Sequence, residues 1–232
     1  MTSSSGGWTL PSLGEMPDEP KWTQWPAGAP GYRVLPYDWD PRDFNPNTTT
    51  DPANPLEGGR FHPFVSATGV RVATLYVASS LTAAIAETLL HDLSLTPTAH
   101  PYSLSMSKVR SHRFAILTPK TDLRLIDLAG AGADRVRIPN ELISWCLREH
   151  YPISRRAAHL LHTKYPSAQG IRWTSRRYPP QDCTVVFGDR VGGSARALVV
   201  EAPPMRELHE PGTEGYPTLE AVMVEAGIVP YP

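Results

Sequence analysis

The sequence has few cysteines and no long apolar run. Cys146 and Cys183 are the two cysteines among 232 residues, and neither belongs to a CxxC motif or a Cys/His cluster. A disulfide scaffold or a zinc site is therefore not expected, and a reducing cytoplasm fits this usage. No stretch approaches the ~20 apolar residues of a membrane span. The N-terminal stretch lacks the basic start and apolar core of a signal peptide, so we expect a cytoplasmic protein without a membrane partner.

The chain also lacks the short motifs of several enzyme classes. It contains no GxSxG, GxxxxGK[ST], HExxH or GxGxxG sequence. The eight histidines show no spacing typical of metal ligands. His159 and His162 stand three residues apart on one face of an expected helix, but no third ligand accompanies them, and we expect both on the surface. We predict neither a metal site nor a bound cofactor.

Proline and charge are what the sequence has in an unusual distribution. The 25 prolines indicate many turns and irregular connections. Residues 1–100 hold five Lys and Arg against 10 Asp and Glu, residues 101–200 hold 16 against seven, and residues 201–232 hold one against six. A basic middle of this kind is typical of a surface that binds phosphate-bearing metabolites, nucleic acid or acidic proteins. Ordinary solvated surface charge explains it equally well.

Periodicity predicts a single α+β domain with a mixed central sheet and interspersed helices. We expect a Pro-rich N-terminal arm over residues 1–30, part of which lies against the body, a domain over 31–205, and an acidic C-terminal extension with a short helix over 206–232. Residues 70–79 are β-branched and apolar, as in a strand. Ser80 then caps an amphipathic helix. Further strands are expected near 108–118, 122–128, 169–175, 183–188 and 196–202, and further helices near 139–149, 153–164 and 217–227.

Four residues are candidates for chemistry. Arg60 follows Gly58-Gly59, and glycines let a backbone approach a ligand whose phosphate an arginine can bind with its planar fork. Glu87 lies beside the apolar stripe of its helix, among alanines that leave space around a carboxylate. Tyr76 and Ser175 lie near the ends of two expected strands, where sites are common. Taken singly, each residue is better explained by structure alone: a turn arginine, a boundary glutamate, a packed tyrosine and a turn serine.

The order of these segments carries more information than any one residue. "YRV", "GGRFHP", "LYVASSLTAAIAETLLH" and "GIRWTSRR…DCTVVFGDR" follow one another over roughly residues 31–190. This order resembles the RES domain family, whose name records an arginine, a glutamate and a serine. The resemblance implies a fold similar to that of ADP-ribosyltransferases. It places the arginine of the name on Arg60, the glutamate on Glu87 and the serine on Ser175.

The resemblance also implies an activity and partners. RES proteins are typically toxins of bacterial toxin–antitoxin pairs that consume NAD. The partner is usually an Xre-type antitoxin, and the toxin would contact nucleic acid only indirectly, through that antitoxin. Arg60 and Glu87 would be catalytic, while Tyr76, Ser175 and the upstream Arg33 would bind substrate. Some members carry an aromatic residue after that arginine; here Tyr32 precedes it and is the aromatic candidate.

The chemistry of NAD agrees with one carboxylate rather than two. Nicotinamide leaves as a neutral molecule, so no general acid is required, and a single carboxylate can stabilise the oxocarbenium-like ribose. We assign that role to Glu87, and the binding of the pyrophosphate to Arg33 and Arg60. Phosphate or water would attack the ribose. Alternatives are a protein ADP-ribosyltransferase using the same pocket, a nucleic-acid-binding or ribonuclease toxin using the basic middle, and a non-catalytic partner-binding protein.

Overall fold

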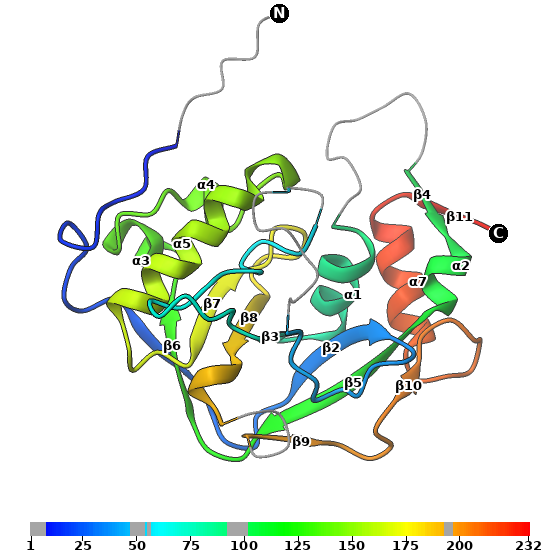
Figure 1. Ribbon diagram of the computed structural model, residues 1–232. Coiled ribbons are helices and arrows are strands. Elements are labelled where there is room, and N and C mark those ends of the chain that lie inside the picture. Colours follow the sequence, from blue (N-terminus) through cyan, green and yellow to red (C-terminus); the bar gives the residue numbers. More distant parts are fainter. Residues whose placement is uncertain (1–7, 47–53, 55–56, 92–101, 193–196) are drawn as a thin grey trace, which may run out of the picture.

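The computed structural model describes residues 8–46, 54, 57–91, 102–192 and 197–232 (Figure 1). The strands are β1 (Trp22–Trp25), β2 (Gly31–Pro36), β3 (Thr74–Ala78), β4 (Tyr102–Ser105), β5 (His112–Pro119), β6 (Leu123–Asp127), β7 (Gly170–Thr174), β8 (Asp182–Phe187), β9 (Leu198–Val200), β10 (Arg206–Glu207) and β11 (Ile228–Tyr231). The helices are α1 (Leu81–Leu89), α2 (Met106–Arg110), α3 (Ala131–Arg135), α4 (Asn140–Ile143), α5 (Tyr151–Lys164) and α7 (Tyr216–Glu225), with the short 3₁₀ helices η1 (Arg148–His150) and η2 (Gly188–Arg190).

One mixed sheet organises the molecule. Its strand order is β1-β6-β7-β8-β3-β2-β5-β10, and β9 pairs with β5 beside this path. The β6–β7 pair is parallel, whereas the other pairs of this sheet are antiparallel. Between β2 and β3 the register contains the single pair Tyr32↔Ala78, so these two strands diverge beyond it. The expected α+β class with a mixed central sheet and interspersed helices is confirmed.

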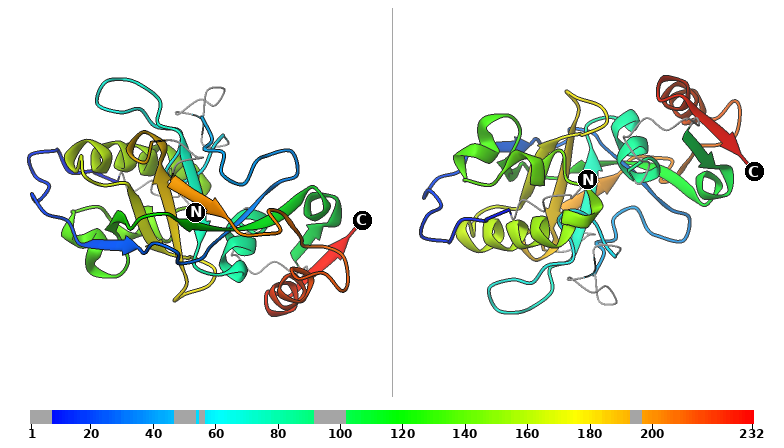
Figure 2. Two further views of the ribbon diagram at one scale, coloured as in Figure 1. Left: turned by 90° about the horizontal axis from the view of Figure 1, so that it is seen from below. Right: turned by 90° about the horizontal axis from the view of Figure 1, so that it is seen from above.

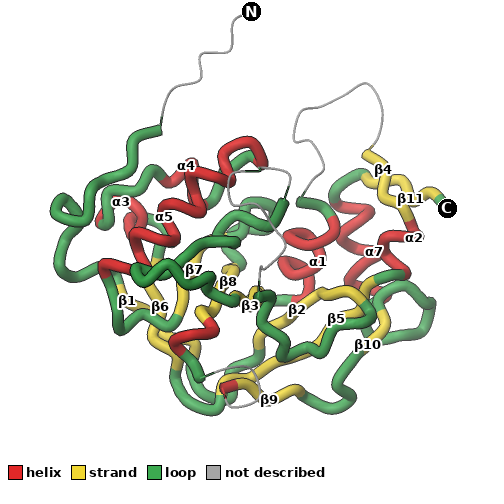
Figure 3. The backbone as a smooth tube through the Cα atoms, viewed as in Figure 1, coloured by secondary structure: helices red, strands yellow, loops and turns green. Residues whose placement is uncertain are grey.

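Helices gather over one face of this sheet in two groups. Figures 1 and 3 show α3, α4 and α5 over the β6–β8 end and α1 beside α7 over the β2–β5 end, and the views of Figure 2 agree. Successive strand residues face opposite sides. In β3, Leu75 and Val77 therefore enter a small apolar cluster on one face, while Ala78 and Tyr76 join the larger cluster that includes residues of α1 and α5.

Helix α1 forms where its sequence predicts it. Ser80 is the N-cap, and its hydroxyl accepts a hydrogen bond from the Ala83 amide at 3.2 Å. The buried face contains Ala84, Ile85 and Leu89, as the spacing indicates. Cap and stripe together fix the rotation of the helix, and that rotation determines where Glu87 points.

The prediction of one helix over residues 139–149 is wrong. The chain forms only α4 and, after an interruption, η1. Leu147 adopts an extended conformation, with φ −79° and ψ 157°. The carbonyl of Cys146 accepts a hydrogen bond from the Arg176 guanidinium at 3.2 Å. The helix is thus interrupted where the Cys146 carbonyl has a tertiary hydrogen-bond partner. Local helix propensity does not reveal such a distant partner.

Both ends of the chain contribute strands to the sheets. β1 pairs antiparallel with β6, and β10 pairs antiparallel with β5. Helix α7 packs against α1, and β11 pairs parallel with β4 in a second, two-stranded sheet. The main sheet thus includes strands on both sides of the boundaries expected near residues 31 and 205. None of the described helices has the length and apolar character that crossing a membrane requires.

Candidate active site

A cavity of about 420 Å³ opens where β2 and β3 diverge, between α1 and the turn at Gly58–His62. This volume lies within the usual range of small-molecule sites. The walls include five of the six residues singled out in the sequence: Tyr32, Arg33, Arg60, Tyr76 and Glu87. The sixth, Ser175, is buried directly behind Glu87.

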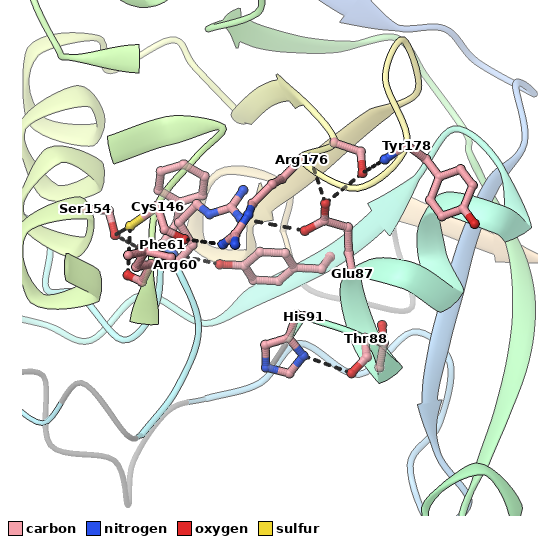
Figure 4. Close-up of polar contacts among 12 residues, drawn as sticks. Arg60, Phe61, Glu87, Thr88, His91, Cys146, Ser154, Arg176 and Tyr178 are labelled. Atoms are coloured by element: carbon pink, nitrogen blue, oxygen red, sulfur yellow. Dashed lines mark hydrogen bonds and ion pairs between the residues drawn. The ribbon is translucent and has the colours of Figure 1, made fainter. Parts of the chain in front are cut away.

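Arg60 and Glu87 face each other across this cavity. Nη2 of Arg60 lies 3.7 Å from Oε2 of Glu87, and Figure 4 shows the carboxylate directed toward the guanidinium. The Arg60 side chain is 7% exposed, yet its Nε and Nη1 have no hydrogen-bond partner among the described residues. Burial alone would lower the pKa of Arg60, but the facing Glu87 carboxylate, together with Tyr151, Cys146 and Cys183, outweighs it and raises that pKa. The guanidinium is therefore charged and retains unused donors.

Glu87 is held from behind by the loop after β7. Its Oε1 accepts hydrogen bonds from the Ser175 hydroxyl at 2.7 Å and from the Arg176 amide at 3.0 Å. The Ser175 oxygen in turn accepts from the Tyr178 amide at 3.2 Å, and the residue is 1% exposed. These bonds occupy one carboxylate oxygen and leave the other toward Arg60 and the cavity. The Ser175 hydroxyl is thus engaged with Glu87 and Tyr178, and Ser175 does not border the cavity.

Glycines shape the turn that carries Arg60. Gly58 has φ +70°, and a Cβ there would lie 2.5 Å from the His62 carbonyl oxygen. A Cβ on Gly59 would lie 2.6 Å from the His62 ring. The Gly59 amide donates to the His62 carbonyl at 2.9 Å. The glycines thus allow His62 to fold back on the turn, and the Gly59 amide is used within the turn.

Tyr76 connects this turn to β3. Its hydroxyl accepts a hydrogen bond from the Phe61 amide at 3.0 Å and lies 2.9 Å from Nδ1 of His62. Burial, with the charge of Arg155, lowers the pKa of His62 to about 4, and burial raises that of Tyr76. The imidazole is therefore neutral, and its Nδ1 shares a hydrogen bond with the Tyr76 hydroxyl. The Tyr76 ring forms a wall of the cavity.

Helix α5 braces the outer side of the same turn. The Ser154 hydroxyl donates to the Arg60 carbonyl at 2.7 Å. Arg155 donates through Nε to the Gly59 carbonyl at 3.1 Å, through Nη1 to the Asn54 carbonyl at 2.9 Å, and through Nη2 to the Glu57 carbonyl. Both side chains are almost fully buried. Sequence reasoning missed this brace, although a serine and an arginine on the buried face of a helix are the signal that could have indicated it.

Arg33 lies on β2 and has a different setting from Arg60. Its Nη1 donates to the carbonyls of Pro41 at 2.6 Å and Asp43 at 2.9 Å. Burial lowers its pKa to about 10. One guanidinium nitrogen of Arg33 thus holds the loop after β2. Tyr32, the preceding residue, also borders the cavity.

Several lining residues were not singled out in the sequence. Trp173, on β7, is buried, and its ring centre lies 5.9 Å from that of Tyr76. The Arg60 guanidinium carbon lies 5.7 Å from the centre of the Trp173 ring. Tyr151 at the start of α5 and His91 after α1 complete the wall. No group of three or more His, Cys, Asp or Glu side chains suited to a metal ion occurs in the part of the chain that the structure describes.

Comparison with known proteins places these residues in a family. No curated protein matches the chain. Among solved structures, a chain of the MbcT–MbcA toxin–antitoxin complex of M. tuberculosis aligns with a TM-score of 0.44 and 19% identity, over 75% of this chain and 84% of that chain. The RES domain matches residues 30–206, a span that contains Arg60, Glu87 and Ser175. The chain therefore belongs to the RES domain family.

Proposed function

We propose that the protein is the toxin of a toxin–antitoxin pair and that it cleaves the bond between nicotinamide and ribose in NAD. The observation that carries this proposal is the facing pair of Arg60 and Glu87, in which a buried cation keeps two donors unused beside a positioned carboxylate. RES family membership supports it, since the family resemblance implies consumption of NAD. An Xre-type antitoxin is the partner that the same resemblance suggests.

Arg60 would bind the pyrophosphate of NAD. The unused Nε and Nη1 of Arg60 can each donate a hydrogen bond to a phosphate oxygen, and such charge-assisted bonds are about twice as strong as neutral ones. The cavity already excludes most water from this side chain. Arg33 lines the same cavity and would add positive charge, although part of its guanidinium is committed to the loop after β2.

Glu87 would act on the ribose. As the C–N bond breaks, nicotinamide leaves with the bonding electron pair and becomes neutral, while positive charge develops on the sugar. A carboxylate fixed by Ser175 and the Arg176 amide stabilises that charge without having to reorganise. An oxygen of inorganic phosphate or of water then forms the new C–O bond, and with water a proton is released to solvent. Ser175 is a positioning residue in this scheme.

Aromatic side chains would hold the nicotinamide. Tyr76 and Trp173 pack edge to face on the helix side of the sheet, and Tyr32 lies on the neighbouring strand. The hydrogen bonds of the Tyr76 hydroxyl to the turn at Phe61 and His62 keep its ring in place. Offset or edge contacts with such rings contribute about 0.5–1.5 kcal/mol per pair.

Identification of the products tests the proposal directly. The purified protein is incubated with NAD, with and without inorganic phosphate, and the products are separated and weighed by mass spectrometry. Free nicotinamide with a phosphorylated ADP-ribose indicates phosphorolysis, and ADP-ribose without phosphate indicates hydrolysis. In a parallel incubation with cell lysate and labelled NAD, transfer of the label to lysate proteins would instead identify the protein ADP-ribosyltransferase alternative. Intact NAD under every condition contradicts the proposed reaction.

A further inference from the structure

A second cavity lies on the other side of the brace formed by α5. Its volume is about 630 Å³, and it opens between the N-terminal arm, the segment after the Arg60 turn and the first half of α5. Figure 1 shows the arm, in dark blue, running along the side of the α3–α5 group. The proposed reaction uses none of the arm residues that border it.

The lining of this second cavity is amphipathic. Pro11, Pro63 and Phe64 are buried in its floor, and Leu10 and Leu160 are half-buried in its walls. The rim carries exposed charged groups and the half-buried His159, whose Nδ1 donates to the Val65 carbonyl at 2.7 Å. An apolar floor with a few polar groups at the edge is typical of sites for small organic ligands.

Positive charge exceeds negative charge in the lining of this cavity, which holds Arg155 and Arg156 against Glu15. Glu15 is engaged locally, because its carboxylate accepts hydrogen bonds from the amide and hydroxyl of Ser12, both at 2.7 Å. Arg156, on the exposed face of α5, has neither an ion pair nor a hydrogen bond from its side chain among the described residues. The unused positive group thus stands beside an apolar hollow, and an arginine fork suits carboxylate or phosphate oxygens.

We propose that this second cavity binds a small amphipathic anion, with an apolar body against Pro63, Phe64 and Leu160 and an anionic head at Arg156. The shared chemistry is that of a medium-length acyl chain with a carboxylate. The head group remains near solvent, and burial of the chain supplies most of the binding free energy.

Occupancy of this site would be felt in the first cavity. Arg155 lines the second cavity and, through the same guanidinium, holds the carbonyls of Glu57 and Gly59 on the turn that carries Arg60. Pro63 and Phe64 follow His62 directly in the chain, so one loop separates the two cavities. A ligand pressing on this loop changes the KM for NAD; this regulatory part rests on the proposed function.

Calorimetric titration with octanoate tests the site without reference to NAD. We expect saturable 1:1 binding to the full chain, and at least about tenfold weaker binding of 1-octanol, which lacks the charge. Arg156→Gln is expected to weaken octanoate binding about tenfold and to leave octanol binding unchanged. Arg110→Gln, the same change on exposed α2, is the matched control and binds octanoate as the parent does. Leu160→Trp fills the hollow and abolishes binding of both compounds.

Three outcomes would overturn the site. They are the absence of saturable octanoate binding, equal affinities for octanoate and octanol, or octanoate binding by Leu160→Trp at the parent affinity when circular dichroism shows that this variant is folded. NAD kinetics form a separate arm. Octanoate binding with an unchanged KM for NAD overturns the coupling between the cavities and keeps the site. Octanoate binding by a protein that consumes no NAD contradicts the proposed function and leaves the site standing.

Discussion

Arg60 differs from the other buried arginines around the cavity in what its nitrogens do. The guanidinium of Arg155 is committed to backbone carbonyls, and so is Nη1 of Arg33, whereas Nε and Nη1 of Arg60 have no partner among the described residues. A buried charge without full hydrogen bonding is costly unless a ligand completes it. This is the physical reason to place an anion beside Arg60 rather than beside its neighbours.

Replacement of Arg60 should therefore weaken NAD binding specifically. In a Glu87→Gln background that suppresses turnover, we expect Arg60→Ala to reduce NAD affinity by about 1.5–3 kcal/mol, or roughly 10- to 150-fold. Calorimetry provides the measurement, and Arg110→Ala on the exposed side of α2 serves as the control. An affinity equal to that of the background variant would remove Arg60 from the site.

Ser175 is predicted to affect turnover more than binding. Its hydroxyl supplies one of the two hydrogen bonds that orient Glu87 and does not itself border the cavity. Ser175→Ala should lower kcat about tenfold, equivalent to one such bond, while the KM for NAD stays near the parent value. Ser103→Ala, an exposed position on β4, controls for the substitution itself. A raised KM with unchanged kcat would mean that the hydroxyl contacts substrate.

Which residues were predictable follows from the range of their contacts. Glu87 could be placed from helical periodicity, because the cap and the apolar stripe of α1 are local. The partner of Ser175 is 88 residues away, and no local pattern reveals it. His162, expected on the surface, is in fact 2% exposed, because its Nε2 lies 3.0 Å from the Asp189 carboxylate and its ring packs between aromatic side chains. The prediction for His162 failed for the same reason.

At the scale of elements, strands and capped helices were predictable and irregular segments were not. The strands expected over 122–128, 169–175 and 183–188 correspond to β6, β7 and β8 within one or two residues. The strand expected from 108 begins at His112, because Met106–Arg110 form α2. The turn at Gly58–His62 was recognised from its glycines, but their purpose was not, since it depends on how His62 folds back.

This turn makes stability depend on pH. The folded state holds the pKa of His62 at about 4, below its ordinary value of 6.5, so between these values the unfolded chain binds the extra proton. The contribution of His62 to the free energy of unfolding should be complete above about pH 6.5. It should fall as the pH drops toward 4, by at most roughly 3 kcal/mol. Urea unfolding of the parent and His62→Gln across this range measures the difference. If the two proteins show the same pH dependence, His62 is not held neutral.

At the scale of the whole molecule, the arm and the tail are built into the fold. The arm provides β1. Before β1, the Asp18 carboxylate of the arm pairs with Lys164 at 3.0 Å, and the Pro17 carbonyl accepts a hydrogen bond from the Tyr165 hydroxyl at 2.8 Å. The tail adds β10 to the sheet and packs α7 on α1, the helix that carries Glu87. Composition indicated an arm that partly lies on the body, but strand pairing with residues about 100 positions away could not be read from proline content.

The central claim is that a single carboxylate, held behind by Ser175 and faced by Arg60, enables cleavage of NAD. The most direct test compares NAD turnover by the parent chain, by Glu87→Gln and by Glu220→Gln, which carries the same change on the exposed face of α7. We predict that Glu87→Gln keeps the parent fold and NAD affinity but loses turnover by at least about 100-fold, the scale of removing a group that stabilises a charged transition state, while Glu220→Gln retains the parent rate. Consumption of NAD by Glu87→Gln at the parent rate would contradict the account.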